Sequence, residues 1–231
     1  APGAPQRPGA RHVSPDAPER PPQFGSRLPR ALALGAAFLL LVVVAFNTLR
    51  TPGTSSSGPA VGDPMPAFAA PLALSSLDGD VNVATRPGQG AAGARPACEL
   101  EGPGILTSCE LVRGRPAALA FLAPGRDRCE DELDALARAA RATPTVRIAA
   151  VALRGDRDDV RGLIRRRGWT FPVAYDRDAI LANLYGVAVC PQVTFVLPGG
   201  RVQDTVVGEQ DVAQLRARLR ALVAQARRTG A

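Results

Sequence analysis

Short apolar runs alternate with helical stretches in the second half of the chain. From residue 115 onward, continuous apolar runs typical of strands buried on both faces are followed by stretches whose apolar residues recur at helical spacing. The pattern predicts strands at 116–123, 146–153, 172–175, 193–197 and 202–207, and helices at 129–142, 156–167, 179–185 and 211–228. A Pro-Gly-Gly-Arg turn joins the last two strands as a hairpin. The order predicts an α/β fold with a central mixed sheet flanked by helices.

A longer apolar run lies near the start of the chain. Residues 31–46 read ALALGAAFLLLVVVAF without a charge, and Asn47, Thr48 and Leu49 extend the run to Arg50. A helix over 31–49 would be about 28 Å long, close to the hydrocarbon thickness of a membrane, and it has no polar face. We therefore predict one transmembrane helix at 31–49. A cleaved signal peptide is the alternative, but the 30-residue leader and the lack of a small-x-small site beyond the run disfavour it.

The flanking charges predict the orientation of this helix. Five arginines precede the apolar run, whereas Arg50 alone follows it closely. The positive-inside rule then leaves a Pro-rich, disordered tail at 1–30 in the cytoplasm and sends the rest of the chain across the membrane. Residues 50–60 are expected to be a flexible linker and residues 61–228 an extracytoplasmic domain. The expected location is thus a single-pass protein of the cell membrane.

Composition excludes several classes of function. The chain has 28 basic residues, all of them arginine, against 21 acidic ones, and only 4% of its residues are aromatic. Much of the excess charge lies before residue 51, so the expected domain is close to neutral and nucleic-acid binding is disfavoured. His12 in the tail is the sole histidine. The domain therefore has no Ser-His-Asp or Cys-His arrangement and no imidazole metal site, and we expect no cofactor.

All four cysteines fall in the expected extracytoplasmic part, where disulfides are favoured over free thiols. Three pairings are possible, and proximity favours Cys98 with Cys109, as a structural bridge across residues 99–108. Closing so short a loop stabilises a fold by roughly 2–3 kcal/mol. Zinc sites need close ligand pairs such as Cys-x-x-Cys, which the sequence lacks, so metal binding is not expected.

Several segments in order resemble the thioredoxin-like redoxin superfamily, and in particular membrane-tethered thiol–disulfide oxidoreductases of the TlpA type, from the AhpC/TSA–TlpA group. They are VGDPMPAF at 61–68, LVRGRPAALAFLA at 111–123, GWTFPVAYD at 168–176, LYGV at 184–187, and Cys190-Pro191 followed by Thr194-Phe195. The resemblance covers about residues 61–225. It implies a thioredoxin-like fold, a cis-proline at Pro191, and exchange with client protein thiols or disulfides and with a redox partner not yet identified.

The resemblance breaks down at the reactive centre. Relatives carry Cys-x-x-Cys at the start of the helix, and in this chain the first of those positions falls on Arg126 and the second on Cys129. The usual nucleophile is absent. Glu132 coincides with a carboxylate that related reductases use to manage protons near the thiols. Cys190, next to the cis-proline, faces the same helix terminus in the family, so a Cys129–Cys190 pair could replace the lost motif.

Three functions remain open for this pair. The first is a thiol–disulfide oxidoreductase that works through Cys129 and Cys190. The second is a non-catalytic thioredoxin-like domain, with structural disulfides, that binds or scaffolds a partner. The third is a thiol peroxidase, although the Pro-x-x-x-Thr/Ser-x-x-Cys pattern of peroxiredoxins is missing. Among the remaining charged residues, we interpret the run 165–167 as a solvated helix end and the acidic cluster 130–134 as electrostatics of a helix's first turn.

Overall fold

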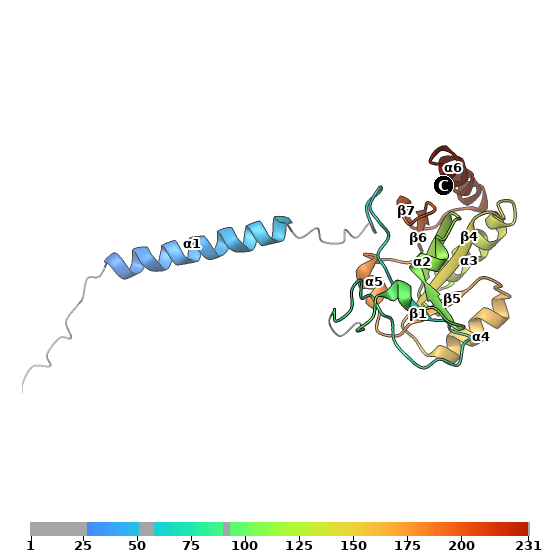
Figure 1. Cartoon of the computed structure of the whole chain (residues 1–231), viewed down its shortest axis with the longest axis horizontal. Coiled ribbons are helices and arrows are strands. Elements are labelled where there is room, and N and C mark those ends of the chain that lie inside the picture. Colours follow the sequence, from blue (N-terminus) through green and yellow to red (C-terminus); the bar gives the residue numbers. More distant parts are fainter. Residues whose placement is uncertain (1–26, 51–57, 90–92, 231) are drawn as a thin grey trace, which may run out of the picture. The chain divides into compact units, whose positions relative to one another are not determined.

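The computed structural model describes residues 27–50, 58–89 and 93–230 and divides into two units, 1–51 and 52–231 (Figure 1). In the first unit, α1 spans Arg27–Arg50 and so begins four residues before the expected start at 31. Pro29 is compatible with this start because backbone N–H groups in the first turn have no partner within the helix. The rest of the expected tail, 1–26, lies outside the described residues. In the described part of the chain, no helix has the length and apolar character that crossing a membrane requires.

The second unit is built around a five-stranded mixed sheet with the order β5-β4-β3-β6-β7. The strands are β3 (Ala117–Leu122), β4 (Arg147–Leu153), β5 (Val173–Asp176), β6 (Gln192–Val196) and β7 (Val202–Val207). The pairs β3–β4 and β4–β5 are parallel, whereas β6 runs antiparallel to both β3 and β7. The predicted α/β class and the mixed sheet are confirmed.

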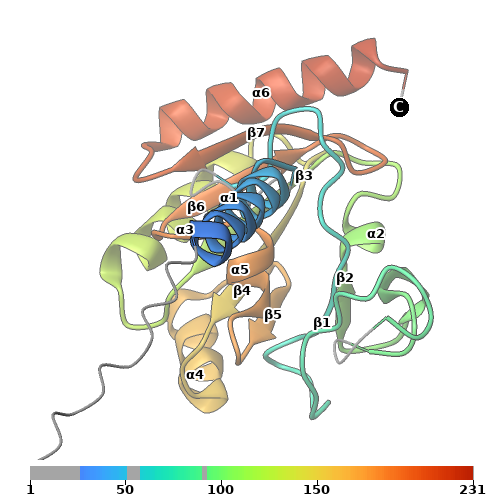
Figure 2. The same cartoon turned by 90° about the vertical axis from the view of Figure 1, so that its left-hand side faces the viewer.

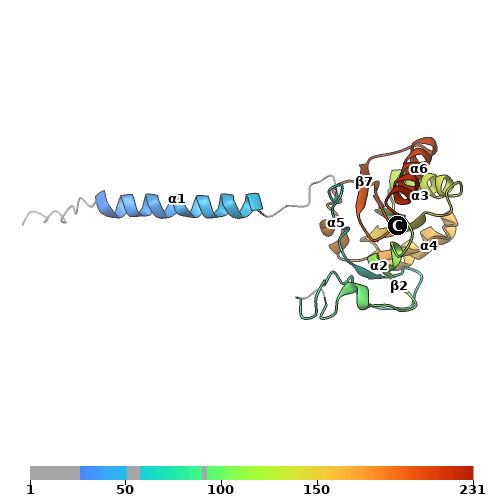
Figure 3. The same ribbon diagram turned by 45° about the horizontal axis from the view of Figure 1, so that its top comes forward.

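Helices cover both faces of this sheet, as Figures 2 and 3 show. One face carries α3 (Asp127–Ala140), α4 (Arg157–Arg167) and α6 (Val212–Arg228). The other face carries α2 (Ser108–Leu111) and α5 (Ile180–Leu184), together with residues of the segment before α2, from Met65 to Leu106. In β3, Ala118, Ala120 and Leu122 belong to the first core, while Ala117, Leu119 and Phe121 belong to the second. A strand alternates its side chains between the two faces, so a wholly apolar strand is required here.

The helix ends follow from capping residues. Asp156 accepts the N–H groups of Asp158 and Asp159 to begin α4, and Gly168, with φ of +67°, ends it in the left-handed conformation that glycine tolerates. Asp211 and Gln214 form a reciprocal capping box at the start of α6. The start of α3 has no such side-chain cap. This helix begins at Asp127, two residues before the expected start, so Cys129 lies within its first turn.

A small second sheet precedes the main one and was not predicted. It consists of β1 (Ala69–Pro71) paired antiparallel with β2 (Ile105–Thr107), and the short 3-10 helix η1 (Ala97–Glu99) lies between them in sequence. The guanidinium groups of Arg157 and Arg161, both on α4, donate to backbone carbonyls of residues 72–77 and hold this segment against the domain.

Most of the expected linker at 50–60 lies outside the described residues. Residue 50 ends α1, residues 51–57 lie outside the described residues, and residues 58–60 already belong to the domain. Gly58 is buried, and the Thr205 hydroxyl on β7 donates to the carbonyl of Pro59 at 3.4 Å. The chain then pairs beside β7, since the N–H of Gly62 donates to the carbonyl of Val202 at 2.8 Å. An open edge strand offers such backbone partners, which explains why the last residues of the linker pack in order.

Candidate functional site

The first wall of the candidate site is the turn between β3 and α3. Gly125, with φ of +77°, allows the chain to turn, and its N–H donates to the Glu130 carboxylate at 3.0 Å. Arg126 is the N-cap of α3, makes no side-chain capping bond and is exposed. Cys129 follows in the first turn, its N–H donating to the Arg126 carbonyl at 2.9 Å, and its side chain is only 2% exposed. The helix start therefore presents an arginine outward and a cysteine inward.

The second wall is the loop between α5 and β6. Tyr185, fully buried, ends α5, and the Gln192 amide donates to the Tyr185 carbonyl at 3.1 Å. The peptide bond between Cys190 and Pro191 is cis, as the resemblance implied. The Pro191 carbonyl accepts the N–H of Gly208 at 2.9 Å, which ties this loop to the end of β7.

The sheet brings the two walls together. In the antiparallel pairing of β3 with β6, Phe121 lies opposite Gln192, so the end of β3 and the start of β6 are neighbours. Cys129 and Cys190, 61 residues apart in sequence, form a disulfide with a Cα–Cα distance of 5.6 Å. Cys129 is buried, whereas Cys190 is only partly buried, with its Sγ 3.5 Å from the Phe121 carbonyl oxygen. The bond thus joins a buried residue to a partly buried one.

A groove of about 770 Å³ opens beside this disulfide. It is lined by the turn and first turn of α3, by the end of β4, and by α5 with the loop that leads to Cys190. Arg126, the residue at the position of the missing nucleophile, lies on this groove rather than in the core. The partly buried Cys190 and the exposed Arg126 therefore both line this groove.

Glu132 lies one turn beyond Cys129 and is 3% exposed. Its Oε2 accepts the N–H of Gln210 at 2.8 Å, while its Oε1 has no hydrogen-bond partner among the described residues. Burial raises the pKa of the Glu132 carboxyl, and the nearby charge of Glu209 adds to this, whereas the hydrogen bond from Gln210 opposes it. A carboxyl of this kind takes up and releases a proton at a higher pH than usual.

The acidic residues of α3 do more than stabilise its first turn. Arg167 at the end of α4 donates to Glu130 at 2.8 Å, Asp131 at 2.9 Å and Asp134 at 2.8 Å. Asp134 also accepts the indole N–H of Trp169 at 2.6 Å. The interpretation of the arginine run as a solvated helix end is therefore wrong for its last member. The run does not reveal which of its arginines turns inward.

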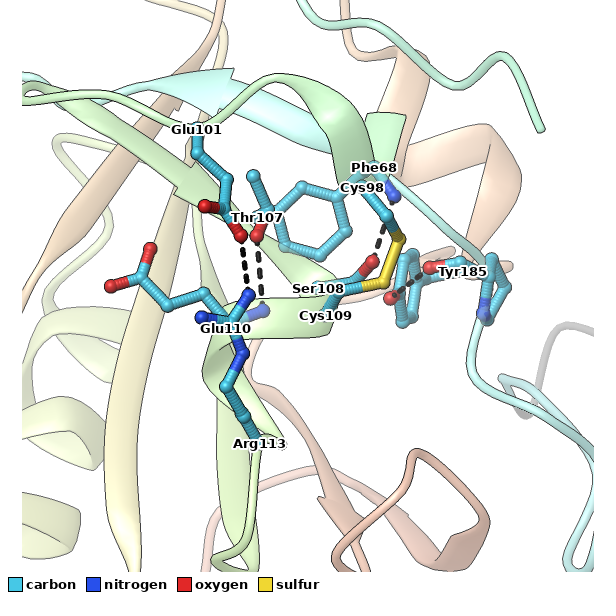
Figure 4. Close-up of a disulfide and its surroundings, with 10 residues drawn as sticks. Phe68, Cys98, Glu101, Thr107, Ser108, Cys109, Glu110, Arg113 and Tyr185 are labelled. Carbon is cyan, nitrogen blue, oxygen red and sulfur yellow. Dashed lines mark hydrogen bonds and ion pairs between the residues drawn. A yellow bond between two sulfur atoms is a disulfide. The ribbon is translucent and has the colours of Figure 1, made fainter. Parts of the chain in front are cut away.

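Cys98 and Cys109 form the second disulfide, with a Cα–Cα distance of 5.6 Å (Figure 4). It joins η1 to α2, and the neighbouring Ser108 accepts the N–H of Phe68 at 3.1 Å. Phe68 packs edge-on against Tyr185, whose hydroxyl donates to the Pro66 carbonyl at 2.8 Å. Every cysteine of the chain is in one of the two bridges. Within the described residues, no group of three or more His, Cys, Asp or Glu could hold a metal ion.

Comparison with solved structures shows the same fold in other proteins. A thiol:disulfide interchange protein DsbE from Chlorobium tepidum, described as putative, is 20% identical, with a TM-score of 0.53 over 72% of this chain and 97% of its own. A putative protein disulfide isomerase from Bacteroides thetaiotaomicron is 13% identical, with a TM-score of 0.54 over 73% and 91%. The MTB protein DsbF is 30% identical, with a TM-score of 0.45 over 49% and 84%. Neither the family models nor the curated protein sequences give a match.

The order of the sheet, the cis-proline at the start of β6 and the cysteine in the first turn of α3 define a thioredoxin-like domain. Solved structures that share this fold include proteins described as a thiol:disulfide interchange protein and a thiol-disulfide oxidoreductase. The chain therefore has the thioredoxin-like fold.

Proposed function

We propose that this chain is a membrane-anchored, extracytoplasmic thiol–disulfide oxidoreductase in which the Cys129–Cys190 pair replaces Cys-x-x-Cys. The observation that carries the proposal is the disulfide between the first turn of α3 and the cis-proline loop, in which Cys129 is buried and Cys190 is partly exposed, and both residues line a groove. A bridge with one partly exposed cysteine beside a groove suits exchange with client protein thiols. The neighbour from Chlorobium tepidum is described as a thiol:disulfide interchange protein, which is the same class of chemistry.

The difference in burial assigns different roles to the two sulfurs. A client thiolate attacks the Sγ of Cys190, because Cys129 is only 2% exposed. The bond between Cys129 and Cys190 breaks, a mixed disulfide forms between the client and Cys190, and the electron pair leaves on Cys129 as a thiolate. A second client thiolate then attacks the client sulfur of the mixed disulfide and releases Cys190. The client is oxidised by two electrons and the pair is reduced to two thiols, and the reverse sequence reduces a client disulfide.

Cys129 is suited to be the leaving group. The free N–H groups at the start of α3 stabilise a thiolate, and a more stable leaving thiolate speeds exchange. Arg126 and Arg128 add to this stabilisation, and the acidic residues of the same turn oppose it. Glu132, with its buried carboxyl and raised pKa, would then accept or supply the proton that Cys129 exchanges. Pro191 would present the backbone beside Cys190 to the client.

Two measurements test the redox function on the full chain. The first is the reduction potential of the Cys129–Cys190 bond, which should lie above about −300 mV, because structural bridges lie below that value. The second is trapping with a client whose single thiol is activated as a mixed disulfide with thionitrobenzoate, so that thionitrobenzoate leaves when the Cys190 thiolate attacks the client sulfur. Cys129→Ser should accumulate a mixed disulfide on Cys190, whereas Cys190→Ser should not trap through the buried Cys129, and both variants should lose reduction of insulin disulfides.

A potential below about −300 mV, together with an absence of trapping in either variant, would refute the enzyme and leave a structural bridge. One observation favours that second candidate, a non-catalytic binding or scaffold domain. Arg126 stands where the oxidoreductases of this superfamily carry their nucleophile, and it is exposed. The third candidate, a thiol peroxidase, is not proposed, since its peroxidatic thiol would have to be accessible and Cys129 is buried in a disulfide.

The membrane anchor at 31–49 is supported by the uncharged run at 31–46 and by the arginines that precede it. Large apolar side chains of α1 are also exposed, among them Leu34 and Phe38 at 72% and 68%. Membranes from cells that express the full chain should retain it after washing with alkaline carbonate. Release into the supernatant, or an amino terminus beginning beyond residue 49 in the mass of the mature chain, would refute a retained anchor. We propose no nucleic-acid partner.

A further inference from the structure

Small and apolar side chains form part of the lining of the groove beside the disulfide. Ala123, Ala182 and Ala188 contribute small side chains, and Val189, immediately before Cys190, is 60% exposed. Small side chains leave room beside Cys190 for a polypeptide in extended conformation, which can bring a sulfur to the Sγ of Cys190. The lining and the volume of the groove, about 770 Å³, thus suit a segment of a protein client.

The rim of the same groove is positively charged. Arg126, Arg128 and Arg154 are exposed and line it, and Asp127 is the sole acidic residue of the lining. Arg128 lies 3.2 Å from the Glu209 carboxylate. Arg126 and Arg154 have no carboxylate within ion-pair distance among the residues that the structure describes. Two guanidinium groups therefore face solvent beside the reactive bond with their charge uncompensated.

The backbone of the groove is strained at two positions. Arg154 and Ala179 have φ of +62° and +57°, and they alone among the described non-glycine residues have positive φ. Both line the groove. Such conformations cost energy in residues with a side chain, and they cluster at functional sites.

Asp176 at the end of β5 bonds to Arg154 and to the two residues that follow Ala179. Its carbonyl accepts the N–H of Arg154 at 2.8 Å, and its fully buried carboxylate accepts the N–H groups of Ile180 at 2.9 Å and Leu181 at 2.8 Å. The same residue thus fixes the backbone that presents Arg154 and the start of α5. The arrangement of the groove is built into the domain rather than left to a mobile loop.

We propose that this groove binds client polypeptide segments whose reactive cysteine is flanked by acidic side chains. The inference rests on the redox function proposed above and specifies its substrate class. The client's carboxylates approach Arg126 and Arg154 while its cysteine meets Cys190. An acidic neighbour disfavours the thiolate of a client cysteine, and the two guanidinium groups offset that penalty within the complex.

Three dithiol peptides test the proposal. They are identical except at the positions that flank their cysteines, which carry Glu in the first peptide, Gln in the second and Lys in the third. Each peptide is mixed with the oxidised full chain, and newly formed thiols are alkylated and located by mass spectrometry. This gives the rate of reduction of Cys129–Cys190 and distinguishes it from reduction of Cys98–Cys109. Each rate is divided by that of the same peptide with hydroxyethyl disulfide, which is neutral, to remove the peptide's intrinsic reactivity. At low ionic strength the corrected rate for the Glu peptide should exceed that for the Gln peptide by about tenfold. The gap should largely close at about 0.5 M salt.

Matched variants locate the effect. Arg126→Gln combined with Arg154→Gln should bring the Glu-to-Gln ratio close to one. Arg138→Gln combined with Arg166→Gln removes the same charge from exposed positions that do not line the groove, and should leave the ratio unchanged. Equal corrected rates for the three peptides, or a faster Lys peptide, would overturn the acidic-client proposal and leave the redox function standing. If none of the peptides reduces Cys129–Cys190, the redox function itself fails.

Discussion

Replacing Arg167 with alanine should destabilise the domain, even though the residue ends a run of three arginines. Its guanidinium group donates to the carboxylates of Glu130, Asp131 and Asp134 and so ties the end of α4 to α3. Glu130 in turn accepts the N–H of Gly125 in the turn that leads to Cys129. The contact therefore supports the helix start on which the proposed chemistry depends.

The burial of the partners sets the magnitude. The Glu130 side chain is 9% exposed, and without Arg167 it keeps only the N–H of Gly125 at 3.0 Å. Removing one partner of a fully buried ion pair costs about 3–5 kcal/mol. Arg167 is 26% exposed and Asp131 68%, so solvent screens part of this interaction. We expect a loss of about 2–3 kcal/mol, which for a domain of this size lowers Tm by roughly 5–10 °C.

Urea denaturation followed by far-UV circular dichroism measures this loss. Arg165→Ala and Arg166→Ala are matched controls, because both side chains are exposed and neither forms an ion pair among the described residues. Their free energies of unfolding should stay within about 0.5 kcal/mol of the original chain. If Arg167→Ala behaves like these two controls, the ion pairs do not stabilise the domain and the reasoning is wrong.

Three further predictions concern stability. Replacing Cys98 and Cys109 together with serine should cost about 3 kcal/mol in urea, given a sequence separation of 11, and an unchanged midpoint would contradict this. Gly168→Ala should cost about 1 kcal/mol from backbone strain alone, since φ is +67° and the added Cβ meets no atom within 4 Å; an unaltered Tm would show otherwise. Because burial raises the pKa of Glu132, the folded chain binds this proton more tightly than the unfolded chain, and stability should fall as the pH rises above 4.5. Glu132→Gln should flatten that fall in a pH series of thermal melts, and parallel curves would argue against the buried carboxyl.

The main sheet and its helices could be predicted because their patterns are strong. β3 and β4 are near-continuous apolar runs, and α4 has an aspartate cap and a terminal glycine. The small sheet could not, since β1 and β2 are three residues each and too short to show a period. The arginines of α4 hold this region by donating hydrogen bonds to backbone carbonyls. Such contacts cannot be predicted from the composition of the chain or the spacing of its residues.

The candidate site was only partly readable from the sequence. The resemblance brought Cys190 and Pro191 into the argument, while the register that sets Phe121 opposite Gln192 explains physically why Cys190 meets Cys129. The groove itself was missed. Arg154 has an ordinary residue type in an uncommon backbone conformation, and only the hydrogen bonds of the folded chain impose it.

The two disulfides differ in the other contacts that keep their cysteines in place. Cys98 and Cys109 join a 3-10 turn to a four-residue helix outside the main sheet, and bonds such as Ala97 N–H to the Ala84 carbonyl and Ser108 N–H to the Phe68 carbonyl hold these segments. The segments that carry Cys129 and Cys190 are already held by the ladder between β3 and β6 and by the bond from Gly208 to Pro191. The sheet can therefore keep these two sulfurs close when the bond between them is reduced. A pair that stays together in both oxidation states can re-form its bond without refolding, which is the property that repeated exchange requires.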